Sequence, residues 1–121
     1  PHRPYKQGTY EKTYEPSEVV IPPYLPDSPE MREDMADYYD EVTRFDTHIG
    51  EVLEVLREEK ELDNTIIIVM TDNGRPFAQC KTRVNVQGVK SPFIVFHPNL
   101  VQKGSATKSL ASAVDIAPTL L

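Results

Sequence analysis

The sequence Thr65-Ile66-Ile67-Ile68-Val69-Met70-Thr71-Asp72-Asn73-Gly74 decides the fold of this chain. Its first six residues form an apolar, largely β-branched run, which is typical of a strand buried on both faces of a parallel sheet. Its last four residues place a carboxylate, an amide and a glycine just past the strand, where open α/β sheets bind ligands. The stretch therefore predicts a central strand with ligand-binding side chains at its carboxyl end.

A long amphipathic helix is predicted before this strand. Ser28 followed by Pro29 is a helix-start signal, because serine caps the first turn and proline already has a helical φ. Apolar residues then recur at three- and four-residue steps, at Met31, Met35, Tyr38, Val42, Phe45, Ile49, Val52 and Leu56. The acidic residues between them are expected to form a solvated face: Glu33, Asp34, Asp37, Asp40, Glu41, Glu51, Glu54 and Glu58. Gly50 is expected to permit close packing of the helix against a neighbour.

The remaining segments complete an α/β pattern. Residues 1–28 are rich in proline and show no regular period, which predicts an extended connection. A second strand is expected over 92–96, and Asp115 is expected to cap a helix that opens at Ile116. A helix followed by a buried strand indicates an α/β fold.

Composition narrows the functional classes. The net charge of −6 disfavours a general nucleic-acid binder, since a phosphate backbone is held by surplus Lys and Arg. Cys80 is the only cysteine, so no internal disulfide can form. The longest apolar stretch is far too short for a membrane span. The chain begins at Pro1 without methionine and its last residues read as helix, so both ends are expected to be cuts within a longer chain.

Asp72 and Asn73 are the candidate metal ligands. Hard oxygen donors of this kind suit Ca²⁺ or Mg²⁺ rather than a soft metal. The same Asp-Asn-Gly tripeptide is also an ordinary turn, so the residues by themselves leave both interpretations open.

The ordered set of motifs resembles the sulfatases of the alkaline-phosphatase superfamily. In chain order the motifs are Val20-Ile21-Pro22-Pro23, Tyr38-Tyr39, Asp46, Ile49-Gly50, Asp63-Asn64-Thr65-Ile66-Ile67-Ile68, Thr71-Asp72-Asn73-Gly74, Lys81, Gly88, Pro92 and Asp115-Ile116-Ala117-Pro118-Thr119-Leu120-Leu121. Pro1-His2-Arg3-Pro4-Tyr5 is similar to the family's active-site histidine segment. The resemblance implies a partial catalytic domain over 1–121. It would hold an extended connection over 1–28 and, over 29–121, part of an alkaline-phosphatase-like sheet flanked by helices.

The resemblance also implies a role for each candidate site residue. Asp72 and Asn73 would ligate a divalent cation, usually Ca²⁺, and Lys81 would lie on the sulfate and balance charge on its oxygens. His2 would face the leaving-group oxygen as a hydrogen-bond donor or general acid. Without the resemblance, an exposed loop lysine and a histidine at a frayed terminus are the ordinary interpretations.

The family's nucleophile is not among these residues. Sulfatases use a cysteine or serine in a Cys/Ser-x-Pro/Ala-x-Arg segment, which is converted to formylglycine. Cys80 is followed by Lys81-Thr82-Arg83 and does not match, so it is interpreted as an incidental buried or half-buried thiol. The resemblance thus implies that the formylglycine lies upstream, in the remainder of the parent chain, and that residues 1–121 alone are inactive. It further implies a periplasmic, secreted or lysosomal location.

The implied reaction is hydrolysis of a sulfate ester or sulfamate on a small molecule or glycan. The short loop between Asn73 and Lys81 is most similar to the sulfamidase branch, the N-sulfoglucosamine sulfohydrolase-like sulfatases, which remove N-linked sulfate from glucosamine ends of heparan sulfate. That branch commonly has arginine in place of Lys81, which holds an oxyanion differently. Local positive charge for an anionic sugar is expected from Arg3, Lys6, Arg75 and Arg83.

Two other functions compete with this one. Phosphonate and phosphodiester hydrolases share the superfamily, but they commonly have Asp-His at positions 72 and 73, so Asn73 favours a sulfatase. A non-catalytic remnant would agree with the missing nucleophile, whereas the intact Asp72, Asn73 and Lys81 argue against decay.

Overall fold

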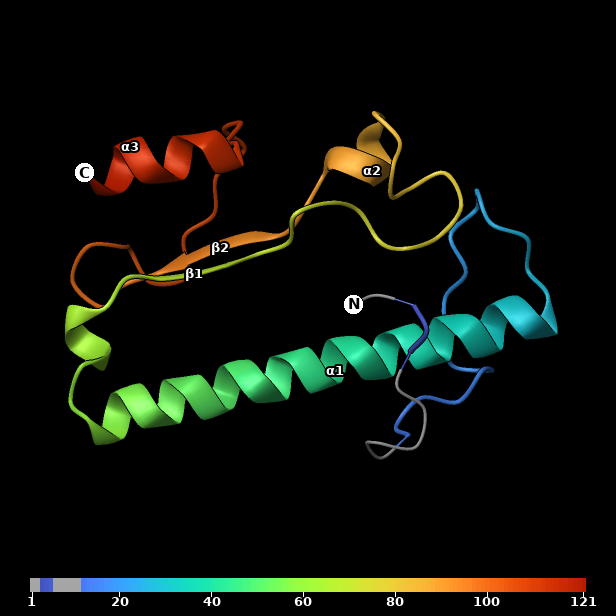
Figure 1. Ribbon diagram of the computed structural model, residues 1–121, viewed down its shortest axis with the longest axis horizontal. Helices are drawn as coiled ribbons and strands as arrows, with labels where there is room; N and C mark the ends of the chain where they lie inside the picture. Colours follow the sequence, from blue (N-terminus) through green and yellow to red (C-terminus); the bar gives the residue numbers. More distant parts are fainter. Residues whose placement is uncertain (1–2, 6–11) are drawn as a thin grey trace.

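The computed structural model describes residues 3–5 and 12–121. In chain order, the elements are α1 (Pro29–Glu58), a short 3₁₀ turn η1 (Leu62–Asn64), β1 (Ile67–Met70), α2 (Val86–Val89), β2 (Phe93–Phe96), a second 3₁₀ turn η2 (Ala113–Asp115) and α3 (Ile116–Leu120). The long helix α1 lies along one side of the molecule, and the strands, α2 and α3 lie along the other (Figure 1). None of the helices in the described ranges combines the length and the apolar character that crossing a bilayer requires.

Helix α1 begins where the sequence predicts. Ser28 has an extended backbone, and its hydroxyl accepts a hydrogen bond from the Met31 N–H at 3.3 Å, with Pro29 in the first turn. The helix then runs for 30 residues to Glu58. Its start is therefore set by a local capping signal that the sequence carries openly.

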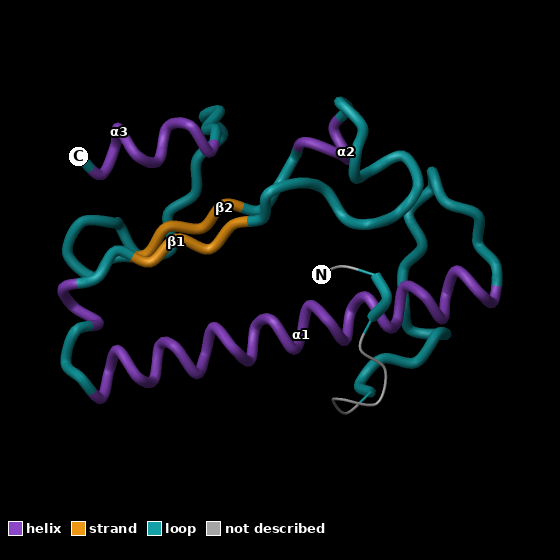
Figure 2. The backbone as a smooth tube through the Cα atoms, viewed as in Figure 1, coloured by secondary structure: helices purple, strands orange, loops and turns teal. Residues whose placement is uncertain are grey.

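The two described strands form an antiparallel pair, which corrects the prediction of a parallel sheet for this part of the chain (Figure 2). Ile67 lies opposite Phe96, and Met70 lies opposite Phe93. Both strands are also shorter than the predicted segments 65–70 and 92–96. A continuous apolar run indicates a strand whose two faces are both apolar, but it does not encode the direction of its partner. Here the chain turns back between 71 and 92, so β2 returns beside β1.

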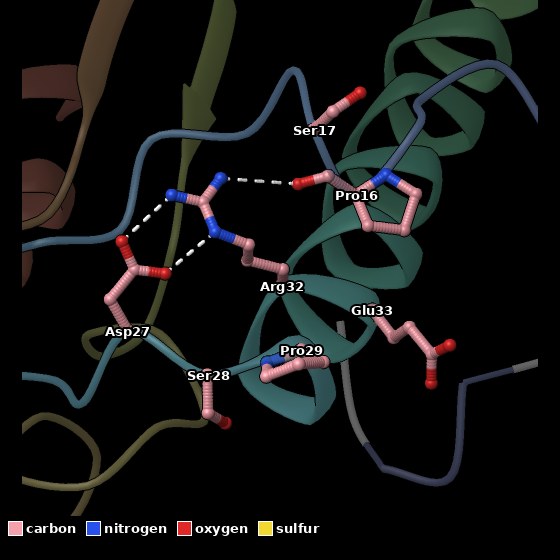
Figure 3. A pocket seen from close by; sticks show the side chains of 7 residues that line it. All are labelled: Pro16, Ser17, Asp27, Ser28, Pro29, Arg32 and Glu33. Atoms are coloured by element: carbon pink, nitrogen blue, oxygen red, sulfur yellow. Dashed lines mark hydrogen bonds and ion pairs between the residues drawn. The ribbon is translucent and has the colours of Figure 1, made fainter.

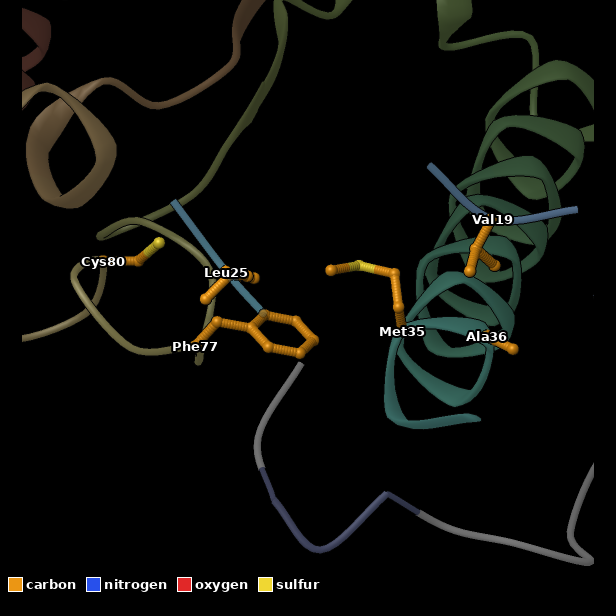
Figure 4. Close-up of a cluster of buried hydrophobic side chains, with 6 residues drawn as sticks. All are labelled: Val19, Leu25, Met35, Ala36, Phe77 and Cys80. Atoms are coloured by element: carbon orange, nitrogen blue, oxygen red, sulfur yellow. The ribbon is translucent and has the colours of Figure 1, made fainter. Parts of the chain in front are cut away.

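The hydrophobic core gathers around the first half of α1. It consists of Val19 and Leu25 from the connection, Met35 and Ala36 from α1, and Phe77 and Cys80 from the loop after β1 (Figure 4). Met35 and Cys80 are fully buried. The predicted connection thus contributes to the core as well as linking segments.

The opposite half of the molecule exposes apolar side chains. All four residues of β2 are exposed, and Ile94 is 58% accessible. A groove of about 340 Å³ lies between α1 and β1 and is lined by Phe45, His48, Ile49, Val52, Leu53, Leu56, Ile67, Ile68, Val69 and Met70. Gly50 has no neighbour within 4 Å of the position a Cβ would take, so the predicted close packing at Gly50 is not seen. This exposed surface is consistent with a partial α/β unit.

Three acidic residues of α1 are buried, which corrects the prediction that they belong to a solvated face. Asp37, Asp40 and Glu41 are between 2% and 6% exposed. The segment after residue 11 contacts two of them: Lys12 Nζ lies 2.9 Å from Asp37 Oδ1, and the Thr13 N–H and hydroxyl donate to Asp40 Oδ1 at 2.9 and 2.6 Å. Glu41 pairs with Arg44 of its own helix. Helical periodicity separates polar from apolar faces, but it does not reveal a second segment that covers the polar face.

Asp115 stands at the start of α3 as predicted, but its side chain does not cap that helix. Its carboxylate accepts from the Ser112 N–H at 2.7 Å, as part of a capping box on η2. Because η2 directly precedes α3, the backbone N–H that the Asp115 carboxylate binds lies at the start of η2 and not in α3. The predicted cap is therefore wrong, although the predicted helix is present.

Candidate functional site

The predicted metal pair follows directly after β1. The side chain of Asp72 is exposed and that of Asn73 is half-buried. The Asn73 amide nitrogen donates to the Gly74 carbonyl at 2.7 Å, and the Thr71 hydroxyl donates to the Asn73 carbonyl at 3.1 Å. Because the amide nitrogen is used in this bond, the amide oxygen is the end that remains for a cation.

Gly74 is required by a close approach of two backbone segments. Its N–H donates to the Gly88 carbonyl at 2.8 Å. A Cβ on Gly74 would lie 1.9 Å from the Gln87 carbonyl oxygen, and one on Gly88 would lie 1.9 Å from that of Arg83. These two glycines therefore hold the loop with the metal pair directly against α2.

Lys81 closes a compact loop that starts at Arg75. Both the Lys81 N–H, at 3.1 Å, and the Phe77 N–H, at 2.9 Å, donate to the Arg75 carbonyl, and the Cys80 N–H donates to Phe77 at 3.2 Å. The Lys81 side chain is half-buried. The backbone of the predicted sulfate-binding lysine is thus fixed by hydrogen bonds to its own loop.

Two buried side chains attach this loop to the rest of the molecule. Phe77 packs edge-on against the Tyr38 ring of α1, with 5.4 Å between the ring centroids. The Cys80 thiol donates to the Tyr24 hydroxyl at 3.5 Å, and its burial agrees with the interpretation of a buried thiol. Burial raises the pKa of Tyr38 and of Tyr24 above that of a free phenol.

Arg3 joins the N-terminal segment, α1 and the loop. Its guanidinium donates to both carboxylate oxygens of Asp34, at 2.6 Å for the Nη1–Oδ1 bond, and its Nε donates to the Pro76 carbonyl at 3.2 Å. It also lies 5.1 Å from the ring centroid of Tyr5 and 5.2 Å from that of Phe77. The hydrogen bonds to Asp34 raise the pKa of Arg3. Since Asp34 balances its charge, Arg3 does not supply the free positive charge for an anionic sugar that the sequence suggested.

The other predicted basic residues are placed unevenly. Arg75 is half-buried and Arg83 is exposed. Lys6 and His2 lie outside the described residues, so the predicted role of His2 at the leaving group stays a prediction.

The donor set suits part of a calcium or magnesium site. Asp72 and Asn73 offer hard oxygen ligands, whereas Ca²⁺ takes roughly six to eight oxygens. Among residues 3–5 and 12–121, no group of three or more His, Cys, Asp or Glu side chains is arranged to hold a metal ion. The pair therefore fits a metal site only together with further ligands.

A separate groove of about 560 Å³ lies at the start of α1 (Figure 3). Its lining residues are Pro16, Ser17, Asp27, Ser28, Pro29, Arg32 and Glu33. Arg32 donates to both Asp27 oxygens, at 2.6 and 2.7 Å, and to the carbonyls of Pro16 and Val19, both at 3.3 Å. Because the Arg32 guanidinium is used in these bonds, we interpret it as holding the connection against α1 rather than as a group that binds a ligand in the groove.

Comparison with known proteins identifies relatives. The Sulfatase family profile matches residues 1–121. Human N-sulphoglucosamine sulphohydrolase is 33% identical over 111 residues, which cover 91% of this chain and 22% of that protein. An ulvan-active sulfatase of Formosa agariphila is 37% identical over 101 residues, covering 84% and 17%. The N-acetylglucosamine-6-O-sulfatase of Bacteroides thetaiotaomicron is 33% identical over 91 residues, covering 72% and 16%.

The chain spans between 16% and 22% of the length of the three curated relatives. No solved structure matches the chain with comparable significance.

Proposed function

This chain belongs to the sulfatase family, and we propose that the complete protein that carries it hydrolyses the sulfate group of a sulfated carbohydrate. The family predicted from the order of the motifs is thereby confirmed. The observation that carries the proposal is the anchored loop 71–91, which brings the metal pair and Lys81 into one hydrogen-bonded unit. Its geometry supports the roles below.

Asp72, Asn73 and Lys81 would each contribute to binding the sulfate group. Asp72 and Asn73 would contribute part of the ligand set of one divalent cation, Ca²⁺ in the first instance and Mg²⁺ as the alternative. Such a cation polarises a bound oxyanion and stabilises charge that develops on it. Lys81 would place its ammonium on the sulfuryl oxygens, where positive charge counts most if water is excluded.

Proton transfer and nucleophilic attack need further groups. His2, which precedes Arg3, would donate a proton or hydrogen bond to the leaving-group oxygen. Sulfatases use a formylglycine as the nucleophile, and no residue of this chain matches the segment that forms it. The nucleophile and the remaining metal ligands would therefore come from residues beyond these 121. By the same family membership, the protein would work in the periplasm, in a lysosome or outside the cell.

The substrate class follows from the relatives and the loop. All three relatives named above are sulfatases or sulphohydrolases, and two of their names specify a glucosamine. The compact segment between Asn73 and Lys81 favours N-sulfated glucosamine as the first candidate, while Lys81 in place of arginine is the feature that departs from the sulfamidase branch. A phosphonate or phosphodiester hydrolase is not favoured, because the comparisons return sulfatases.

A direct assay of the complete protein tests this proposal. Release of sulfate would be measured from matched N-sulfated and O-sulfated glucosamine, with a phosphonate ester of similar size as the control substrate. We expect turnover of a sulfated glucosamine, with the N-sulfate preferred. Preference for the O-sulfate would discard the sulfamidase assignment. Activity on the phosphonate ester alone would discard the sulfatase assignment.

A further inference from the structure

We propose that Arg3 is a positioning residue that holds Lys81 in place for the sulfate, by fixing the loop 75–81 against α1. The inference rests on the proposed function of Lys81 and adds a residue that the family comparison does not assign. It is carried by the contacts of Arg3 with three separate parts of the molecule: the N-terminal segment, α1 and the loop.

Arg3 contacts the loop through both its backbone and an aromatic ring. Its Nε donates to the Pro76 carbonyl at 3.2 Å, and its guanidinium carbon lies 5.2 Å from the Phe77 ring centroid. The same guanidinium is held by the two oxygens of Asp34 on α1. One planar group therefore connects the helix to the loop across 31 and 73 residues of sequence.

The contact of Arg3 with Pro76 is linked to Lys81 by a short series of backbone bonds in the loop. Pro76 follows Arg75, whose carbonyl accepts the N–H of Lys81 at 3.1 Å. Between these residues, Phe77 is 6% exposed and Cys80 is fully buried, so the loop has little freedom to move on its own. A shift of Pro76 away from α1 would consequently move the backbone of Lys81.

The chemistry of arginine explains why this residue type suits the role. A forked guanidinium can donate to a carboxylate with two N–H groups, donate Nε to a carbonyl and stack on a ring at the same time. An ammonium on a flexible stem cannot keep all these contacts in one geometry. Because a displacement of about 1 Å at a catalytic group can cost up to about 100-fold in rate, a small loss of this clamp has a measurable effect.

Arg32 provides a matched control within the same chain. It forms an equivalent forked pair with Asp27, at 2.6 and 2.7 Å, and also donates to backbone carbonyls. Its partners belong to the connection, at residues 16, 19 and 27, and not to the loop 75–81. Arg3→Ala and Arg32→Ala therefore remove similar interactions from two places, only one of which leads to Lys81.

The test is a double-mutant cycle in the complete protein. We expect Arg3→Ala to lower kcat/KM for a sulfated glucosamine by about 10- to 100-fold and to weaken inhibition by inorganic sulfate in parallel. Arg3→Lys should stay impaired by at least about 5-fold, because the fork is lost. In the Lys81→Ala background, the further loss from Arg3→Ala should shrink to less than about 3-fold. Arg32→Ala should change kcat/KM by less than about 3-fold.

Other results would overturn the inference. An equal loss from Arg3→Ala in both backgrounds, full rescue by Arg3→Lys, or a comparable loss from Arg32→Ala would show that Arg3 only stabilises the fold. A complete wild-type protein that binds inorganic sulfate but turns over no sulfate ester or sulfamate would instead overturn the proposed function, and the inference with it.

Discussion

The two halves of α1 carry the same amphipathic pattern but lie in different surroundings. Met35, in the first half, is fully buried, whereas Phe45 and Val52, in the second half, are 46% and 60% exposed. The first half is covered by the connection and by the loop after β1, which supply Val19, Leu25, Phe77 and Cys80 to the core. The second half faces an apolar groove and a two-stranded sheet in which β1 is half-buried and β2 is exposed.

This difference shows what an amphipathic pattern does and does not determine. The pattern fixes which face of a helix is apolar, while burial depends on another segment that covers that face. The covered half holds the loop with Lys81, so the chain supplies by itself the packing that orders its candidate site. The open half has an apolar face that no segment of the described chain covers. We propose that the rest of the complete protein covers this face, since the chain spans between 16% and 22% of the length of its three curated relatives.

Removing a side chain from the covered half should have the largest effect on stability. Met35→Ala deletes a fully buried side chain from the core, and we expect a loss of about 2 to 5 kcal/mol of unfolding free energy. Denaturant unfolding of the complete protein measures it. A loss below about 1 kcal/mol would mean that the covered half is not a true core.

A pair of glycine substitutions makes the same chemical change in the anchored loop 71–91 and in the open half of α1. Gly88→Ala forces a Cβ to within 1.9 Å of the Arg83 carbonyl oxygen and should cost about 1 to 3 kcal/mol. Gly50→Ala meets nothing within 4 Å and should stabilise the helix by up to about 1 kcal/mol. Denaturant unfolding of the complete protein, followed by circular dichroism, measures both. Equal effects of the two changes would remove the distinction between the anchored loop and the open half of α1.

A charge placed on the open half should change association. Ile94 is 58% exposed in the middle of an apolar strand, and an exposed apolar edge invites pairing with another copy. We expect the 121-residue chain to self-associate and Ile94→Lys to weaken that association by about 10-fold, or about 1.4 kcal/mol. Sedimentation of the wild-type chain and the variant would show this. A wild-type chain that is monomeric and unfolds cooperatively would contradict the account of an incomplete unit.

The features predicted correctly from the sequence are those set by neighbouring residues. Ser28 and Pro29 start α1 because a cap acts within one turn. The β-branched run gives β1, and the polar pair follows it at the expected place. The position of Asp72 and Asn73 just past the strand end is likewise a local pattern, whereas their role as metal ligands stays a prediction.

The features that were missed or predicted wrongly depend on contacts between residues that are distant in sequence. The direction of β2, the burial of Asp40 under Thr13 and the clamp from Arg3 to Asp34 each require two segments to meet. The hydrophobic periodicity of one segment does not indicate which other segment will contact it. A partial signal existed for Gly74 and Gly88, since a glycine often stands where two backbone segments approach closely.

The affinity of the complete protein for Ca²⁺ tests the central claim most directly, because Asp72 and Asn73 stand where the open strand pair passes into the anchored loop. Calorimetric titration would compare the wild type with Asp72→Ala and Asn73→Ala. The account predicts that Asp72→Ala weakens binding by at least about 100-fold and Asn73→Ala by clearly less, since only the aspartate brings a charge to the cation. Small and equal effects of the two substitutions would contradict it, and would show that the pair is no more than a turn.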